Sequence, residues 1–181
     1  MNRRTFLSGS AGALPGIVNA VEQSGIGTSR AILVRAGQSL GGEIWQLADR
    51  SFLHLKLNAG NGEGPLIVEQ SQLRRFGPPR HMHPNQDEWF YPLVGTYLIE
   101  VGEERFELLP GDFLFAPRGL PHVWMHVEEE PGRLLIGFEP AGKMVGFFRR
   151  FTAGGVLPRP EEMPALMAED GMKFIGPPLK S

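Results

Sequence analysis

The stretch from Gly77 to His126 reads GPPRHMHPNQDEWFYPLVGTYLIEVGEERFELLPGDFLFAPRGLPHVWMH and decides how the chain is interpreted. It contains four side chains of the types that bind transition metals: His81, His83, Glu88 and His122. The chain has only five histidines, and three of them stand in this set. Because side chains alternate along a strand, His81 and His83 project to the same side. Imidazoles with a carboxylate suit Fe, Mn, Ni, Co, Cu or Zn, so the stretch predicts one divalent transition metal of undetermined identity.

Composition limits the chain to one globular domain. It has 181 residues and a formal net charge of -2, and this near-neutral balance argues against nucleic-acid binding. The absence of cysteine restricts metal ligands to nitrogen and oxygen atoms. With 24 glycines and 16 prolines, the sequence favours many short strands over long helices.

The N-terminus predicts an export signal. Residues 1–20 begin with a basic pair, Arg3-Arg4, continue with a weakly apolar run, and end near Ala20, in an order that resembles a twin-arginine signal. The run is too short and too polar for a stable membrane span. We therefore expect a periplasmic or exported protein. The alternative is a disordered start on a cytoplasmic protein.

Short apolar runs separated by turn residues predict an all-β sandwich or barrel over residues 30–140. The expected strands are residues 32–35, 43–47, 52–57, 66–72, 88–94, 97–101, 105–109, 113–116, 122–127 and 133–139. Residues 141–181 form a tail with helices expected at 144–151 and 161–170 and an extended end. The first helix either covers the barrel mouth as a lid or packs outside it.

Two blocks in the central stretch resemble the two motifs of the cupin superfamily. In the first, His81-x-His83, four residues, Glu88, six residues and Gly95 are in register, whereas the opening glycine, Gly77, stands two positions too close. In the second, the glycine at 111, the Pro-x-Gly at 117–119 and His122 match, whereas a histidine at 126 replaces the usual Asn. The resemblance implies a double-stranded β-helix, or jelly-roll barrel, in which His81, His83, Glu88 and His122 bind the metal.

Within this superfamily, the Asp87–Tyr91 strand and the extended tail resemble single-domain quercetin dioxygenase-like proteins. That resemblance implies a metal-dependent dioxygenase acting on a small enol or phenol. It also implies a choice of roles for Glu88, as a structural ligand or as the base that accepts the substrate proton. Two alternatives remain: a non-catalytic, metal-containing binding protein, and a metal-dependent decarboxylase or isomerase. A homodimer that exchanges residues 31–47 is also consistent with the resemblance.

Several aromatic side chains are candidates for the substrate pocket. By alternation with the ligands along their strands, they are expected to face the barrel interior, either as pocket lining or as plain core. They are Phe90, Trp124, Phe113, Phe115 and Phe138. His126 lies about 13 Å along the strand from His122, at roughly 3.3 Å per residue, which is too far to share its metal.

Overall fold

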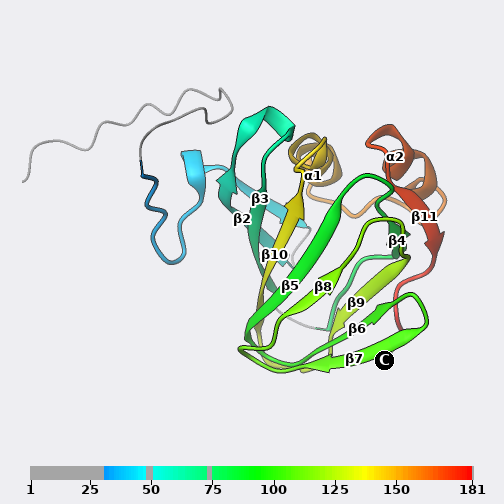
Figure 1. Cartoon of the computed structure of the whole chain (residues 1–181). Coiled ribbons are helices and arrows are strands. Elements are labelled where there is room, and N and C mark those ends of the chain that lie inside the picture. The colour runs from blue at the N-terminus through cyan, green and yellow to red at the C-terminus, as the bar shows by residue number, and fades with distance from the viewer. Residues whose placement is uncertain (1–30, 48–50, 73–74, 181) are drawn as a thin grey trace, which may run out of the picture.

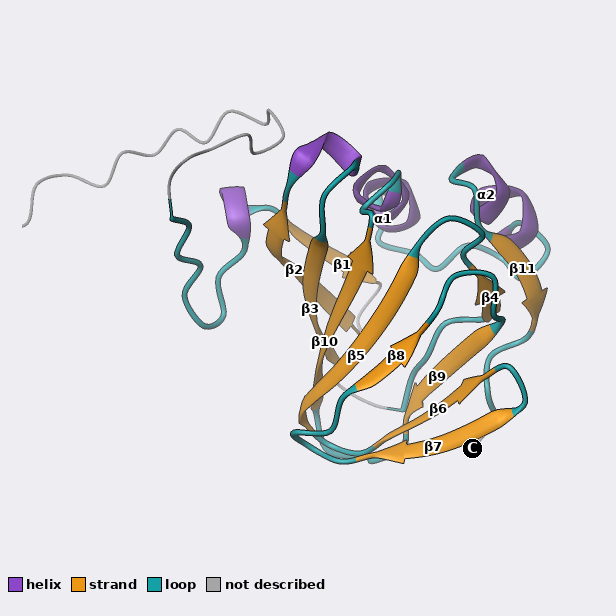
Figure 2. Ribbon diagram, viewed as in Figure 1, coloured by secondary structure: helices purple, strands orange, loops and turns teal. Residues whose placement is uncertain are grey.

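In the computed structural model, which describes residues 31–47, 51–72 and 75–180, antiparallel strands form two sheets (Figures 1 and 2). The six-stranded sheet contains, in spatial order, β1 (Ile44–Leu47), β2 (Ser51–Asn58), β3 (Leu66–Gln72), β10 (Gly132–Glu139), β5 (Asp87–Val94) and β8 (Leu114–Ala116). The five-stranded sheet contains β11 (Lys173–Gly176), β4 (Arg80–Met82), β9 (His122–His126), β6 (Tyr97–Val101) and β7 (Glu104–Leu108). The expected all-β jelly roll with a helical tail is confirmed.

The core lies between the two sheets. Strand β10 pairs with β3 on one side and β5 on the other. This late strand therefore lies between two strands from earlier in the chain. Alternating side chains of these strands point inward, among them Val68, Phe90 and Leu134, each 0% exposed. From the other sheet, Tyr97 and Ile99 are equally buried. The two-residue period of the sequence therefore sets which face is apolar.

The prediction of a strand at residues 32–35 is wrong. Residues 31–35 have no regular structure, and the exposed fractions of Ile32 and Leu33 are 39% and 75%. The apolar run has no partner strand within the described residues, and an unpaired run does not form a sheet. The expected signal segment, residues 1–20, lies outside the part of the chain that the structure describes.

Strand β4 had not been expected as a separate element. It is three residues long, yet it pairs with β9 through His81 and His122 and with β11 through Phe174 and His81. The extended end of the tail thus becomes an edge strand directly beside the first histidine. Pairing on both sides holds this short segment in place.

Two helices close one end of the barrel, α1 (Met144–Thr152) and α2 (Met163–Glu169) (Figure 1). They bury an apolar face of Phe147, Phe148, Met163 and Met167. Arg150 of α1 forms an ion pair with the buried carboxylate of Asp170, which ends α2, and this pair ties the helices together. We call α1, α2 and the connection between them the roof.

Two 3-10 turns, Leu40–Gly42 and Gly60–Gly62, complete the elements. No helix among the described residues has the length and apolar character needed to cross a membrane.

Candidate metal centre and substrate cavity

Strands of both sheets position the four candidate ligands. His81 lies in β4, His83 follows that strand directly, and His122 begins β9, all in the five-stranded sheet. Glu88 lies in β5 of the opposite sheet. The pairing of His81 with His122 in register places two imidazoles side by side. The cluster therefore lies between the sheets, where two layers contribute to one site.

The ligand atoms converge. One atom from each of the four residues lies within 4.8 Å of the others. The Oε2 atom of Glu88 is 2.7 Å from Nε2 of His122, 3.2 Å from Nε2 of His83 and 4.0 Å from Nε2 of His81. All four residues are at most 6% exposed. The Nε2 atoms thus face the carboxylate from three directions.

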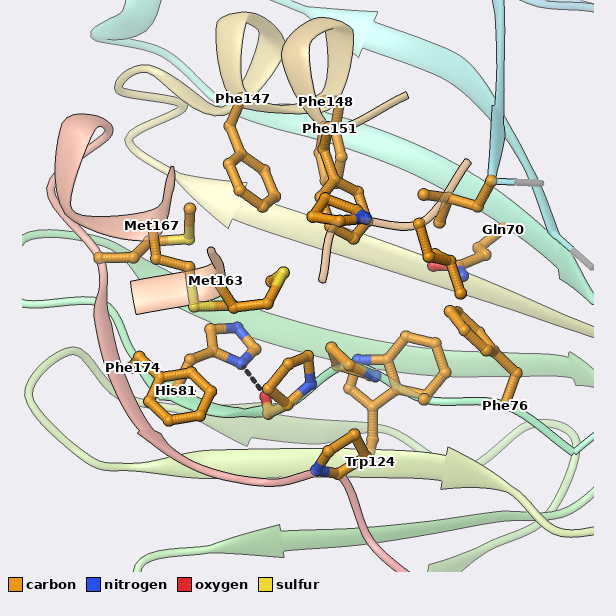
Figure 3. A pocket seen from close by; sticks show the side chains of 18 of the residues that line it. Gln70, Phe76, His81, Trp124, Phe147, Phe148, Phe151, Met163, Met167 and Phe174 are labelled. Carbon is orange, nitrogen blue, oxygen red and sulfur yellow. Dashed lines mark hydrogen bonds between the residues drawn. The ribbon is translucent and has the colours of Figure 1, made fainter. Parts of the chain in front are cut away.

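Each imidazole is oriented through its other nitrogen. Nδ1 of His81 lies 2.8 Å from the carbonyl oxygen of Pro79, a contact drawn as the dashed line in Figure 3. Nδ1 of His122 lies 3.1 Å from the carbonyl oxygen of Leu120. A carbonyl oxygen only accepts, so these Nδ1 atoms carry the hydrogen and donate it. Nε2 of the neutral ring then keeps its lone pair for a metal.

Gln86 performs the same task for His83. Its Nε2 donates to the carbonyl oxygens of Pro140, at 3.0 Å, and Ala141, at 2.7 Å. These two bonds fix the amide so that Oε1 faces Nδ1 of His83 at 3.1 Å and accepts its hydrogen. The sequence analysis had missed Gln86, because its two partner carbonyls lie more than fifty residues away.

Burial sets the charges of the cluster. Loss of solvent lowers the pKa of His81 to about 3, with further lowering by His122 and His83, so this ring is neutral near pH 7. Burial opposes ionisation of Glu88, yet its contacts with His122 and His83 hold its pKa below the usual range. The site therefore contains a buried carboxylate faced by a neutral imidazole.

These residues fit a divalent metal. The Glu88 carboxylate is 2% exposed, and within the described residues its ion-pairing partners are the three histidines, with no Lys or Arg. An uncompensated buried charge is costly, and a cation among the converging atoms would neutralise it. Three imidazoles and one carboxylate are a donor set for a borderline divalent metal.

An apolar cavity of about 360 Å³ adjoins the cluster and has His81 and Glu88 in its wall (Figure 3). Phe147, Phe148 and Phe151 of the roof line it from above. Of the two expected positions for α1, a lid over the barrel mouth or a place outside the barrel, the structure shows the lid. Among the described residues that line the cavity, no Lys or Arg occurs. Such a cavity suits a largely apolar ligand that has one polar end at the cluster.

The candidate pocket aromatics divide into three groups. Trp124 and Phe138 line the cavity. Phe90 is fully buried against His122, with ring centroids 6.2 Å apart, and belongs to the core beside the cluster. Phe113 and Phe115 are 62% and 51% exposed on the outer surface, so the expectation that they face the barrel interior is wrong.

The register of β8 gives the reason for this correction. Ala116 stands opposite Glu88, and it is Ala116 that faces inward, at 1% exposure. Its neighbour Phe115 pairs with Trp89 and must point to the other side of the sheet. Phe113, just before the strand, packs against Trp89 on the outer side, with ring centroids 5.9 Å apart.

The remaining sequence candidate, His126, is buried at the far end of β9. Its ring lies 5.1 Å from that of Tyr97, and it is not part of the metal cluster, as its spacing from His122 indicated.

The displaced glycine of the first motif, Gly77, also has a clear role. A Cβ at this position would lie 1.9 Å from the carbonyl oxygen of Trp124, so no side chain fits between this segment and β9.

Comparison with known proteins shows what parts of this chain are similar to. Residues 73–138 match the family model described as Cupin domain. No curated protein matches the sequence closely. An RmlC-like cupin from Shewanella frigidimarina shares 19% identity at a TM-score of 0.50, over 61% of this chain and 96% of the other. At this identity the likeness shows a shared fold.

Two further solved structures are similar over shorter stretches. KdgF from a Halomonas species shares 19% identity over 54% of this chain and 86% of its own, at a TM-score of 0.48. TT1209 from Thermus thermophilus shares 33% identity over 43% of this chain and 74% of its own, at a TM-score of 0.41.

Proposed function

The chain carries a cupin domain with a buried cluster of three histidines and one glutamate, and from that site we propose a metal-dependent dioxygenase that acts on a small enol or phenol. The observation that carries the proposal is the cavity itself. Its wall is apolar, it has the ligand cluster at one side, and its described lining residues include no Lys or Arg. Its volume of about 360 Å³ falls in the range of about 300–1,000 Å³ typical of small-molecule sites.

The apolar wall selects against the alternative of a carboxylate or sugar substrate. A decarboxylase or isomerase that handles such a substrate needs a cationic or strongly hydrogen-bonding wall to replace the lost hydration. An enol or phenol needs only one polar contact, at the oxygen that loses its proton. That oxygen would lie at the cluster while the carbon skeleton contacts the aromatic and aliphatic lining.

Glu88 is the residue we assign to proton transfer. It lines the cavity, and its lowered pKa keeps it ionised, so it can accept the proton of a substrate hydroxyl bound beside it. A bound divalent metal would supply Lewis acidity to the substrate oxygen and a site for O₂. His81, His83 and His122 hold their Nε2 atoms in place through the fixed Nδ1 contacts.

The roof protects the deprotonated substrate. Phe147, Phe148 and Met163 stand between the cavity and solvent, with exposed fractions of 5–8%. Excluding water slows reprotonation of the enolate and strengthens its interactions with the charged groups of the site. The second role left open by the sequence, a binding protein without turnover, would use the same wall and is an outcome of the test.

The test combines metal content with oxygen uptake. Wild-type protein should contain about one metal ion per chain, measured by mass spectrometry, and should consume O₂ with 3-hydroxyflavone or a simple β-diketone enol. Glu88→Gln should lose O₂ uptake by about 10²-fold or more, since the base is removed. Glu104→Gln, on the exposed edge strand β7, is the matched control and should leave uptake unchanged.

Each outcome separates the candidate functions. Substrate-dependent O₂ uptake that Glu88→Gln abolishes supports the dioxygenase. Metal and ligand binding without O₂ uptake supports the binding protein. Release of CO₂ from a β-keto acid without O₂ uptake would assign the decarboxylase instead and overturn the proposal.

A further inference from the structure

The end of the cavity away from the ligand cluster contains one buried amide, Gln70 of β3. Apart from the ligands and the indole of Trp124, it is the only side chain with a hydrogen-bonding group among the described residues of the lining. It is 4% exposed. Figure 3 places it on the side of the cavity opposite His81, with its amide pointing into the cavity. A single polar group in an apolar wall can select a ligand that forms a hydrogen bond with it.

The orientation of this amide is fixed from behind. Nε2 of Gln70 donates to the hydroxyl oxygen of Ser51, 2.7 Å away, and Ser51 is 0% exposed. On the neighbouring strands, Leu53 and Leu134 stand directly opposite Gln70 and offer no polar atom from their side chains. Oε1 therefore remains as the acceptor, and it has no hydrogen-bond partner within the described residues.

This oxygen faces the cavity, and an acceptor there that receives no donor from the protein is available to a donor of the ligand. The strands β2 and β3 are already held together by their backbone pairing along seven residue pairs, so the Ser51 contact is not needed to join them. The amide is thus built to present a carbonyl oxygen to whatever occupies the cavity.

We propose that Gln70 determines specificity by accepting a hydrogen bond from a hydroxyl or N–H group at the end of the substrate remote from the metal ligands. The substrate class is then a flat molecule with two polar ends, an enol or phenol oxygen at the cluster and a hydrogen-bond donor at Gln70. This proposal rests on the proposed function only for the enol or phenol oxygen at the metal ligands. Recognition by Gln70 concerns binding and holds with or without turnover.

The experiment compares two ligands that differ by one hydroxyl group, 3-hydroxyflavone and its 4′-hydroxy derivative. Their dissociation constants are measured on the metal-loaded protein by quenching of tryptophan fluorescence. Wild type should bind the hydroxylated ligand about tenfold more tightly, the effect of one hydrogen bond in a dry site. Gln70→Met keeps the side-chain length and removes the acceptor, so it should bind the two ligands equally.

Two further variants separate recognition from structure. Gln72→Met changes a buried amide two residues along the same strand that does not line the cavity, and it should keep the tenfold preference. Ser51→Ala leaves the Gln70 acceptor in place but releases its orientation, so it should reduce the preference to about threefold. If Gln70→Met does not fold, the Ser51→Ala result still tests the assignment.

The outcomes are distinguishable from failure of the proposed function. Loss of discrimination in Gln70→Met supports the assignment even when O₂ uptake is absent. An unchanged preference in Gln70→Met, equal binding of both ligands by wild type, or no binding of either ligand would each overturn it.

Discussion

Gln86 offers a direct test of how the metal cluster is held. Its amide connects Nδ1 of His83 to the carbonyl oxygens of Pro140 and Ala141 and is 7% exposed. Replacing it by Leu removes the acceptor that fixes the tautomer and rotation of His83. The same change leaves three buried polar groups without their partner. Metal affinity and folding stability should therefore both fall, for separable reasons.

The magnitudes follow from these contacts. Loss of an outer partner of a metal-binding histidine lowers metal affinity about 10- to 100-fold, or about 1.4–2.7 kcal/mol. Each buried group left unpaired costs about 1 kcal/mol or more, so unfolding of the metal-free protein should become easier by roughly 3 kcal/mol. Gln86→Glu keeps an acceptor for His83 but cannot donate to Pro140 and Ala141. It should lose about 2 kcal/mol of stability while keeping metal affinity within about threefold of wild type.

Metal affinity is measured by competition with a chelating dye, and stability by urea unfolding of the metal-free protein. Gln38→Leu, at an exposed glutamine before β1, is the matched control and should change neither quantity. The reasoning is refuted if Gln86→Leu binds metal as tightly as wild type, or if Gln86→Glu and Gln86→Leu lose metal affinity equally.

Three further predictions concern packing, pH and the roof. Gly77→Ala should lower the free energy of unfolding by about 2 kcal/mol or more, because its Cβ would overlap the carbonyl oxygen of Trp124, and urea denaturation would show it. For His81, the folded pKa of about 3 lies below the ordinary 6.5, so the unfolded chain binds the proton first. The melting temperature of the metal-free protein should thus fall as pH drops from 6.5 toward 3, and a flat profile would contradict this. Arg150→Gln leaves the buried carboxylate of Asp170 uncompensated, so limited proteolysis should cut the roof at residues 153–162 several-fold faster than in wild type.

The strands could be read from the sequence wherever local pattern and pairing agree. The runs at 66–72 and 97–101 became β3 and β6 with the same bounds, because two-residue alternation matches a half-buried strand. The run at 32–35 has the same local character but no partner strand in the described part of the chain, so it is not a strand. Conversely, β4 is too short to be recognised alone, and its strand character depends on β9 and β11.

The cluster could be predicted because metal ligands must be specific side chains at specific spacings, and His81, His83 and Glu88 lie on adjoining short segments. The face of Phe115 could not, because the turn at 110–112 separates β8 from earlier strands and resets the alternation. Gln86 and Gln70 carry no local signal either. Their partners become visible only when distant strands are assembled.

The single carboxylate of the cluster has a consequence for the charge of the bound molecule. If a divalent ion were held by Glu88 and three neutral imidazoles, one net positive charge would remain in a cavity whose described lining residues include no Lys or Arg. The singly charged enolate of the proposed function would bring this enclosure to electroneutrality. A doubly charged ligand would leave a buried negative charge with nothing to balance it. A metal-loaded cluster would thus discriminate ligands by their charge, while the apolar wall and the roof would discriminate them by shape.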